Sequence, residues 1–222
     1  MRGRFITFEG GEGAGKSTQA SLLVRRLKAL ALTVVLTREP GGSAGAEIIR
    51  YVLLSGAAKP LGAETETVLF AAARDDHVRT MIVPALERGK WVVCDRFIDS
   101  TRVYQGTLGN VDPRLIRSLE RVTIADAMPD LTFILDLPAE IGLERAAKRR
   151  GAEKADRFEQ ETLAFHKKLR DAYRDIAASE PGRCVMIDAQ RAQSAVADDI
   201  WAAVTDRLDP ATAPLALEDS AR

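Results

Sequence analysis

The sequence contains only two cysteines, and their scarcity limits the kinds of site that the protein can build. Cys94 and Cys184 lie far apart, and each falls in a short apolar segment that is typical of a buried strand. Two thiols in this arrangement indicate neither a zinc site nor a disulfide framework. We therefore expect two reduced core cysteines in a cytoplasmic protein.

The chain also lacks an excess of charge of either sign. Lysine plus arginine and aspartate plus glutamate are equal, at 32 residues each. A balanced chain has no general attraction for a phosphate backbone, so we expect no nucleic-acid partner.

Long hydrophobic runs are missing as well. The longest apolar stretches, such as residues 33–36 and 91–94, have the length of strands. They fall far short of the ~20 residues that a transmembrane helix needs. The first apolar segment begins directly after Met1-Arg2-Gly3-Arg4, which leaves no room for a signal peptide. We expect no membrane partner and a cytoplasmic location.

A glycine-rich loop is the most informative feature that the sequence does contain. Residues 10–17 read Gly-Gly-Glu-Gly-Ala-Gly-Lys-Ser and match the phosphate-loop pattern G-x-x-x-x-G-K-[ST] in full. Glycines let backbone amides curl around phosphate oxygens, and the helix that follows adds the positive end of its dipole. Lys16 is predicted to reach the β- and γ-phosphates of ATP, and the Ser17 hydroxyl to ligate Mg²⁺. The predicted phosphate-binding residues are Gly10, Gly11, Gly13, Ala14, Gly15, Lys16, Ser17 and Thr18.

Short apolar segments alternate with helical patterns along the whole chain. Strands are predicted at residues 5–8, 33–37, 91–94, 131–137 and 184–187. Helices are predicted at residues 15–30, 44–54, 64–88, 113–124, 139–149, 157–178 and 194–208. This alternation indicates an α/β fold, a parallel five-stranded sheet with helices on both faces. We expect one domain over residues 1–208 and a frayed tail over residues 209–222.

Polar motifs follow three of the predicted strands. They are the phosphate loop, Arg38-Glu39-Pro40-Gly41-Gly42 and Asp95-Arg96, and ligands of parallel sheets bind beyond these strand ends. Together with segments 69–74, 100–106 and 129–131, these motifs make the sequence resemble the thymidylate kinases, which phosphorylate dTMP to dTDP. The resemblance covers about residues 4–207. It implies a P-loop nucleoside-monophosphate-kinase fold, ATP with Mg²⁺, and a homodimer; Arg102 stands where the family usually has a small residue.

Phe70 and Arg74 are four residues apart on a predicted helix and share one face. A ring there can stack on a base while the guanidinium donates to a base carbonyl, although the two residues alone favour a core phenylalanine beside a solvated arginine. The resemblance implies that they bind thymine and that Arg50 and Arg96 hold the phosphate of dTMP. The dTMP-binding residues that it implies are Glu39, Arg50, Phe70, Arg74, Arg96, Ser100, Thr101, Tyr104 and Gln105.

Glu12 is an acid inside a loop that should bind polyphosphate, and such an acid is repelled unless a cation lies between them. The resemblance places Glu12 near the transferred phosphoryl group and its Mg²⁺, with Asp95 as a second metal candidate or an ion-pair partner of an arginine. One subgroup of the family carries an arginine in this loop. This chain has Gly11 and Ala14 there, so we expect the positive charge to come from elsewhere.

A basic segment near residue 150 is the predicted source of that charge. Arg145 and Arg149 are one turn apart, Arg150 follows, and Gly151 interrupts the helix. The segment 146–157 then forms a short lid that brings arginines over the ATP phosphates and excludes water. Composition alone equally allows a solvated basic helix end. The predicted catalytic residues are Lys16, Glu12, Arg96, Arg149, Arg150 and Arg145.

The predicted helix 64–88 carries more apolar residues than one buried stripe explains: Val68, Ala71, Ala72, Val78, Ile82 and Ala85. An isologous dimer interface would account for them, and so would packing within the chain. Two other functions stay open at this point. One is a different nucleoside-monophosphate or nucleoside kinase on the same fold. The other is a nucleotide-dependent switch, whose guanine-reading N-K-x-D motif the chain lacks.

Overall fold

The computed structural model describes residues 2–124, 126–151 and 158–211, and a five-stranded sheet lies at its centre. The strands are β1 (Phe5–Gly10), β2 (Val34–Arg38), β3 (Trp91–Asp95), β4 (Leu131–Asp136) and β5 (Cys184–Asp188). They run in the order β2-β3-β1-β4-β5, and every pairing is parallel. The predicted α/β fold is confirmed. Because β1 lies in the middle, the loop that follows it opens at the centre of the carboxyl edge.

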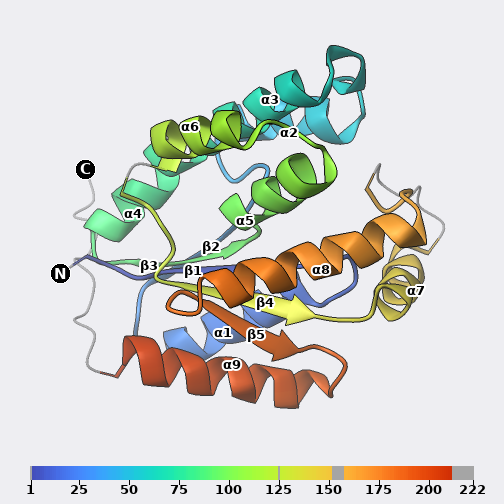
Figure 1. Cartoon of the computed structure of the whole chain (residues 1–222). Coiled ribbons are helices and arrows are strands. Elements are labelled where there is room, and N and C mark those ends of the chain that lie inside the picture. Colours follow the sequence, from blue (N-terminus) through green and yellow to red (C-terminus); the bar gives the residue numbers. More distant parts are fainter. Residues whose placement is uncertain (1, 125, 152–157, 212–222) are drawn as a thin grey trace.

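Helices cover both faces of the sheet (Figure 1). On one face lie α1 (Lys16–Ala29) and α9 (Gln193–Leu208), whose buried residues pack with β1 and β5. On the side of the other face lie α3 (Ala63–His77), α4 (Val83–Glu87), α5 (Ile98–Thr101), α6 (Pro113–Ile124) and α8 (Leu163–Ser179). Two helices remain: α2 (Ala44–Leu54) packs on α3, and α7 (Ala139–Arg150) follows β4.

Strand β1 divides its side chains between the two faces, as the twofold period of a strand requires. Ile6 and Phe8 belong to the core beneath α1 and α9. Phe5 points the other way and meets the ring of Phe97 edge-on, with 4.9 Å between centroids. Thr7 and Glu9 follow Phe5 at the same spacing, and both are fully buried. The middle strand therefore places two polar side chains beneath the helices of that face.

Two predicted helices differ from the structure. The predicted helix 64–88 is a continuous run of α3, a π-helical segment (Val78–Ile82) and α4. Pro84 lies just after that segment and removes one amide from the ladder. The predicted helix 157–178 instead begins at Leu163, where the Thr162 side chain accepts a hydrogen bond from Phe165 N at 3.2 Å. Such a cap defines where a helix starts.

Segment 98–108 is helical, and this element was not predicted. It consists of α5 and a π-helical turn (Arg102–Leu108). The sequence of this segment shows little apolar periodicity, because several of its polar side chains form hydrogen bonds and ion pairs within the protein. Arg102 pairs with Glu120 at 2.8 Å and with Glu180 at 2.6 Å. The side chain that departs from the family pattern thus fastens this segment to α6 and to the end of α8.

The remaining predictions concern membrane spans, the two cysteines, the lid and the tail. Among the described residues, the helices are too short or too polar to cross a bilayer. Cys94 and Cys184 are both buried free thiols. The predicted lid reaches beyond the described residues at 152–157, and the predicted tail does so at 212–222.

Candidate active site

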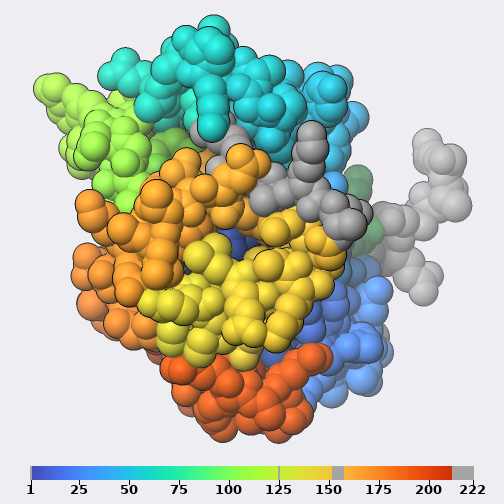
Figure 2. All heavy atoms as spheres, turned by 90° about the vertical axis from the view of Figure 1, so that its right-hand side faces the viewer, coloured from blue at the N-terminus to red at the C-terminus, as the bar shows by residue number. Residues whose placement is uncertain are grey.

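The carboxyl ends of β1, β2 and β3 open into a cavity of about 420 Å³. Its walls come from the phosphate loop, from α2 and α3, and from the segment that follows β3. Figure 2 shows dark-blue atoms of the N-terminal part at the base of a hollow that yellow and orange segments frame. The cavity brings together most of the predicted residues: Glu12, Gly13, Gly15, Lys16, Ser17, Thr18, Glu39, Arg50, Phe70, Arg74, Asp95, Arg96, Ser100, Thr101, Tyr104, Gln105 and Arg149.

The phosphate loop has a geometry that only glycine allows at Gly13. Its φ is 67°, and a Cβ there would lie 2.0 Å from the Gly142 carbonyl oxygen of α7. The loop therefore packs directly against the helix that carries Arg145, Arg149 and Arg150. Lys16 Nζ donates to the carbonyl oxygens of Gly10 at 3.1 Å and Gly11 at 2.7 Å.

Lys16 is buried but lies on the cavity wall. Burial, followed by the nearby Arg96, lowers the pKa of its ammonium group to about 8. A phosphate beside Lys16 would raise this pKa again, because a negative charge favours the protonated amine. The site therefore holds a cation that is prepared for an anionic ligand.

Glu12 and Arg96 face each other across the loop. Arg96 Nη2 donates to Glu12 Oε1 at 2.5 Å, and the Tyr104 hydroxyl donates to the same oxygen at 3.3 Å. Burial opposes the charge of Glu12, but Arg96 and Lys16 outweigh it and hold the pKa of the carboxyl at about 2. An arginine thus neutralises the acid that the sequence places beside the polyphosphate.

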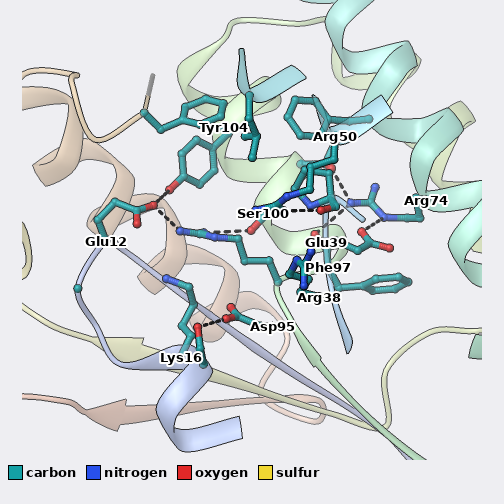
Figure 3. Close-up of a pocket in the computed structure, with 18 of the residues that line it drawn as sticks. Glu12, Lys16, Arg38, Glu39, Arg50, Arg74, Asp95, Phe97, Ser100 and Tyr104 are labelled. Carbon is teal, nitrogen blue, oxygen red and sulfur yellow. Dashed lines mark hydrogen bonds and ion pairs between the residues drawn. The ribbon is translucent and has the colours of Figure 1, made fainter. Parts of the chain in front are cut away.

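The guanidinium of Arg74 is fixed by buried acceptors (Figure 3). Its Nε donates to Glu39 Oε2 at 2.8 Å, and its Nη2 donates to Phe97 O at 3.1 Å and to Thr101 Oγ1 at 2.9 Å. The other oxygen of Glu39 lies 3.0 Å from Nδ1 of the buried His77. The structure thus connects Glu39 to Arg74 and gives His77 a structural contact, while Phe70 lines the same cavity.

Ser17 and Asp95 bring two oxygen ligands together where the loop meets β3. The Ser17 hydroxyl donates to Asp95 Oδ2. In the described part of the chain, His, Cys, Asp and Glu form no cluster of three that could hold a metal alone. Mg²⁺ usually takes one or two protein oxygens and completes its shell with phosphates and water. Ser17 and Asp95 therefore fit Mg²⁺ that arrives with a nucleotide.

A second cavity of about 310 Å³ lies on the other side of the loop, against α9. Ala14 and Arg145 line it, and Arg149 lines both cavities. Arg145 Nη1 donates to Ala189 O at 3.1 Å, so this side chain is already fixed. Arg150 lies on neither cavity wall and instead pairs with Glu159 at 2.5 Å, while Arg149 Nη2 is 3.3 Å from the other oxygen of Glu159.

Several lining residues were not predicted. Arg38, Pro40 and Phe97 belong to motifs that the sequence displays, so the motifs were the signal for them. The second cavity adds residues that follow β5 or lie in the first turn of α1, where the rule that ligands bind beyond strand ends was the available signal: Gln19, Ala189, Arg191 and Gln193. Leu54 and Phe158 carry no such signal.

Comparison with known proteins gives one consistent family. The thymidylate kinase family model matches residues 8–200. A thymidylate kinase of Nitrobacter winogradskyi is 66% identical over 207 residues, which cover 93% of this chain and 90% of that protein. One of Bradyrhizobium diazoefficiens is 64% identical over 212 residues, which cover 96% of this chain and 93% of that protein.

A solved structure agrees with these sequence relatives. The crystal structure of thymidylate kinase from Ehrlichia chaffeensis superposes with a TM-score of 0.73 at 35% identity and covers 92% of this chain and 99% of that one. The family model spans most of the chain. The chain belongs to the thymidylate kinase family.

Proposed function

We propose that this chain transfers the γ-phosphoryl group of ATP to dTMP in the cavity beyond β1, β2 and β3. As a thymidylate kinase it forms dTDP and ADP, a step of nucleotide biosynthesis. The observation that carries the assignment of the site is that one cavity holds both the phosphate loop and the Phe70/Arg74 pair. A donor phosphate and an acceptor base can therefore occupy the same continuous space.

The acceptor half of the cavity suits a pyrimidine nucleotide. Phe70 supplies a ring for stacking, and Arg74 is fixed by Glu39 and Thr101 so that it can donate to a base carbonyl. Arg96 and Arg50 hold the acceptor phosphate in this proposal. Ser100, Tyr104 and Gln105 line the sugar side of the cavity, where Tyr104 crowds the 2′ position.

The donor half rests on the phosphate loop. Lys16 and the loop amides hold the ATP phosphates, and Arg96 offsets the charge of Glu12. Mg²⁺ would be held by Ser17 and Asp95, with Glu12 through water, and when bound it neutralises charge on the β- and γ-phosphates. The acceptor phosphate is already a nucleophilic anion, so positioning and charge neutralisation supply most of the catalysis without a strong general base.

Residues 1–208 form a single kinase domain in this proposal, with a lid at about residues 146–157. The lid is of the type that carries its arginines outside the phosphate loop. Support comes from Arg149, which lines both cavities from the end of α7, one on each side of the phosphate loop. We also place the enzyme in the cytoplasm, where ATP is abundant and where buried free thiols such as Cys94 and Cys184 persist.

A substrate panel tests base choice. With ATP and Mg²⁺, ADP release should be fastest with dTMP, and dUMP should be used about 10- to 200-fold less efficiently, because it lacks only one methyl group. dCMP should rank below dUMP, since its amino group would face the donors of Arg74. Coupled ADP release, run also with CMP and AMP, measures kcat/KM. A preference for dCMP over dTMP would overturn the assignment of this pocket.

The homodimer is proposed from a surface on the outer helices. Of the apolar residues in segment 64–88, Ala71, Val78, Ile82 and Ala85 are buried within the chain, which favours intramolecular packing for these four. Val68 is 45% exposed, and Ile48 and Tyr51 on the neighbouring α2 are 71% and 78% exposed. An apolar face of this kind suits an isologous interface between two copies.

Sedimentation at micromolar concentration should give twice the mass of one chain. The double variant Ile48→Glu/Tyr51→Glu should sediment as a monomer, because it places two charges against their own copies. Met186→Glu is the matched control, since Met186 is a partly exposed residue on β5, at the sheet edge opposite β2. A monomeric wild type would refute the dimer.

A further inference from the structure

Glu9 is a fully buried acid that the proposed reaction does not use. It is the last side chain before the phosphate loop, and it points to the face of β1 beneath α5 and α8. An acid in such a place is costly unless its oxygens accept hydrogen bonds. Burial, and then the neighbouring Asp99, raise the pKa of Glu9 to about 7. A buried acid kept at this cost invites a functional explanation.

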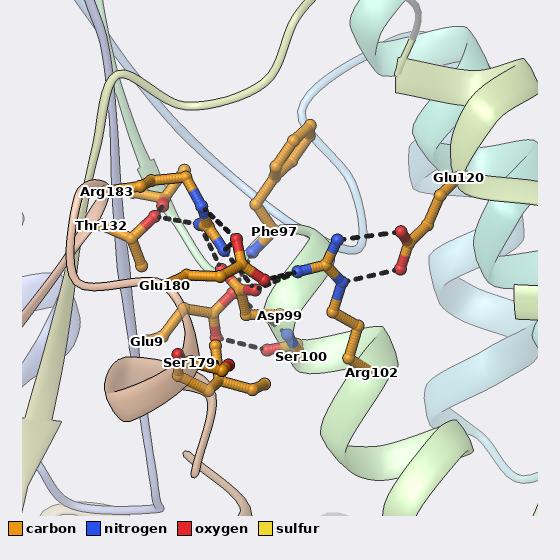
Figure 4. A network of polar contacts seen from close by, with 12 residues as sticks. Glu9, Phe97, Asp99, Ser100, Arg102, Glu120, Thr132, Ser179, Glu180 and Arg183 are labelled. Carbon is orange, nitrogen blue, oxygen red and sulfur yellow. Dashed lines mark hydrogen bonds and ion pairs between the residues drawn. The ribbon is translucent and has the colours of Figure 1, made fainter. Parts of the chain in front are cut away.

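The two oxygens of Glu9 have separate partners. Oε1 accepts from the backbone amides of Phe97 at 2.7 Å and Ser100 at 3.1 Å. These amides belong to the turn between Arg96 and α5, which follows β3. The carboxylate on β1 therefore caps a short helix that belongs to another part of the chain. Oε2 accepts from the hydroxyls of Ser100 at 2.7 Å and Tyr173 at 3.0 Å. Figure 4 shows Glu9 beneath this turn, close to Ser100 and Phe97.

Those two hydroxyls also accept hydrogen bonds from Arg96, whose guanidinium is held in addition by Glu12 and by Gly10 O. Its Nη1 donates to Ser100 Oγ and to the Tyr173 hydroxyl oxygen, both at 3.3 Å. A hydroxyl that gives its hydrogen to Glu9 presents its lone pairs to the guanidinium, so each one connects the acid to the arginine. Glu9 thereby sets the direction in which both hydroxyls point.

The backbone at Arg96 needs the same support. Its φ is 68°, which is the left-handed region that side-chain-bearing residues rarely adopt. Its amide donates to Phe8 O at 2.9 Å, and the next amide, of Phe97, donates to Glu9. Phe8 and Glu9 are consecutive residues of β1. One short stretch of the middle strand therefore supports the backbone of Arg96 directly and its side chain through the hydroxyls of Ser100 and Tyr173.

We infer that Glu9 is a positioning residue for Arg96, acting through Ser100 and Tyr173 and through the turn at Phe97. The inference rests on the proposed role of Arg96 in holding the acceptor phosphate. Glu9 keeps the guanidinium aimed at that phosphate before dTMP arrives. Tyr173 extends the same support to α8, so the acceptor site depends on a helix that follows the lid in sequence.

The experiment compares Glu9→Gln with the wild type. Glutamine keeps the size of the side chain and one oxygen for the two amides, but its NH₂ group cannot accept from the two hydroxyls. At pH 8, above the pKa of about 7 so that the Glu9 carboxylate is charged, we expect kcat/KM for dTMP to fall about 10- to 100-fold, the usual cost of losing hydrogen bonds to a charged group. KM for ATP should stay within about twofold of the wild-type value, because Lys16 and the loop amides are not fastened by Glu9.

A second variant keeps the inference testable if Glu9→Gln does not fold. Tyr173→Phe removes one of the two hydroxyls and should lower kcat/KM for dTMP in the same direction by a smaller factor. The double variant should lose less than the product of the two single losses, since both act on one arginine. Thr7→Val is the matched control. It removes a buried hydrogen bond of 2.7 Å between Thr7 and Thr132 of β4, while the Glu9 carboxylate and the hydroxyls of Ser100 and Tyr173 stay in place.

The outcomes separate the two claims. A wild type that does not phosphorylate dTMP would refute the proposed function. An active wild type whose Glu9→Gln and Tyr173→Phe variants keep its kcat/KM for dTMP would refute the role of Glu9. Equal losses for ATP and dTMP, matched by Thr7→Val, would also refute it, because they would assign Glu9 to folding alone.

Discussion

Replacing Lys16 by alanine should lower turnover by on the order of 10²–10³, the usual loss for one preorganised charge-stabilising donor. Lys16 Nζ donates to two loop carbonyls, at 3.1 Å and 2.7 Å, and it lies on the cavity wall. In the proposed reaction it leaves these carbonyls for the β- and γ-phosphates. Negative charge is spread over the γ-phosphoryl oxygens in the transition state, so the missing cation costs most there.

The measurement is steady-state ADP release at pH 7, where Lys16 is protonated because its pKa is about 8. Lys28→Ala is the matched control, since it removes an exposed lysine from the last turn of the same helix and should keep full turnover. Circular dichroism and thermal melting show whether each variant is folded. A folded Lys16→Ala protein with near-normal turnover would refute the role of Lys16.

The sequence predicted the order of elements well because the signals of this fold are local. A strand, a glycine-rich loop and a helix follow one another at residues 5–29, and each is specified by its own residues. The helices that begin at Ala44 and at Pro113 were predicted to the residue, the second from Asp112 and the following proline. The phosphate loop and the strand-end motifs also meet in one cavity, as parallel strands require.

The rest depends on contacts between segments far apart in the sequence. Segment 98–108 is helical because Glu9 caps its first turn, while Arg102 and Asp99 pair with residues of later elements, including Arg183 at 2.7 Å. A local pattern does not contain that information. Likewise, no sequence motif links Glu9 to Tyr173, yet the Tyr173 hydroxyl oxygen lies 3.0 Å from Glu9 Oε2. Whether a side chain is exposed also depends on segments that are distant in the sequence. For this reason the sequence did not show that four of the six apolar residues in segment 64–88 belong to the core.

Removing the arginines of α7 should lower turnover more than any other change. If they supply the charge that the phosphate loop lacks, the variant without Arg145, Arg149 and Arg150 should lose turnover by on the order of 10³ or more, as when an arginine finger is removed. The structure ranks the three. Arg149 is 65% exposed and lines both cavities, so it is free to turn toward a transferred phosphoryl group. Its ion pair with Glu159, at 3.3 Å, is long.

The other two arginines have more restricted positions. Arg145 already donates to Ala189 O in the second cavity, and Arg150 holds Glu159 at 2.5 Å. We therefore expect Arg149→Ala to account for most of the loss, Arg145→Ala to act mainly on ATP, and Arg150→Ala to act through the placement of Glu159. Because the three share one helix end, their effects should not add, and every combination is needed.

Kinetics at saturating ATP and Mg²⁺ separate transition-state charge from ground-state binding. Arg149→Ala should lose turnover while KM for dTMP changes little, because a charge that acts on the transferring group is used only in the transition state. Lys148→Ala is the matched control: Lys148 precedes Arg149, is 76% exposed, and pairs with Glu144 instead of reaching a cavity. If every arginine combination keeps more than about a third of wild-type turnover, the loss falls far below that of an arginine finger. The segment is then a solvated basic helix end, and the charge opposite the γ-phosphate must come from Lys16 and Arg96.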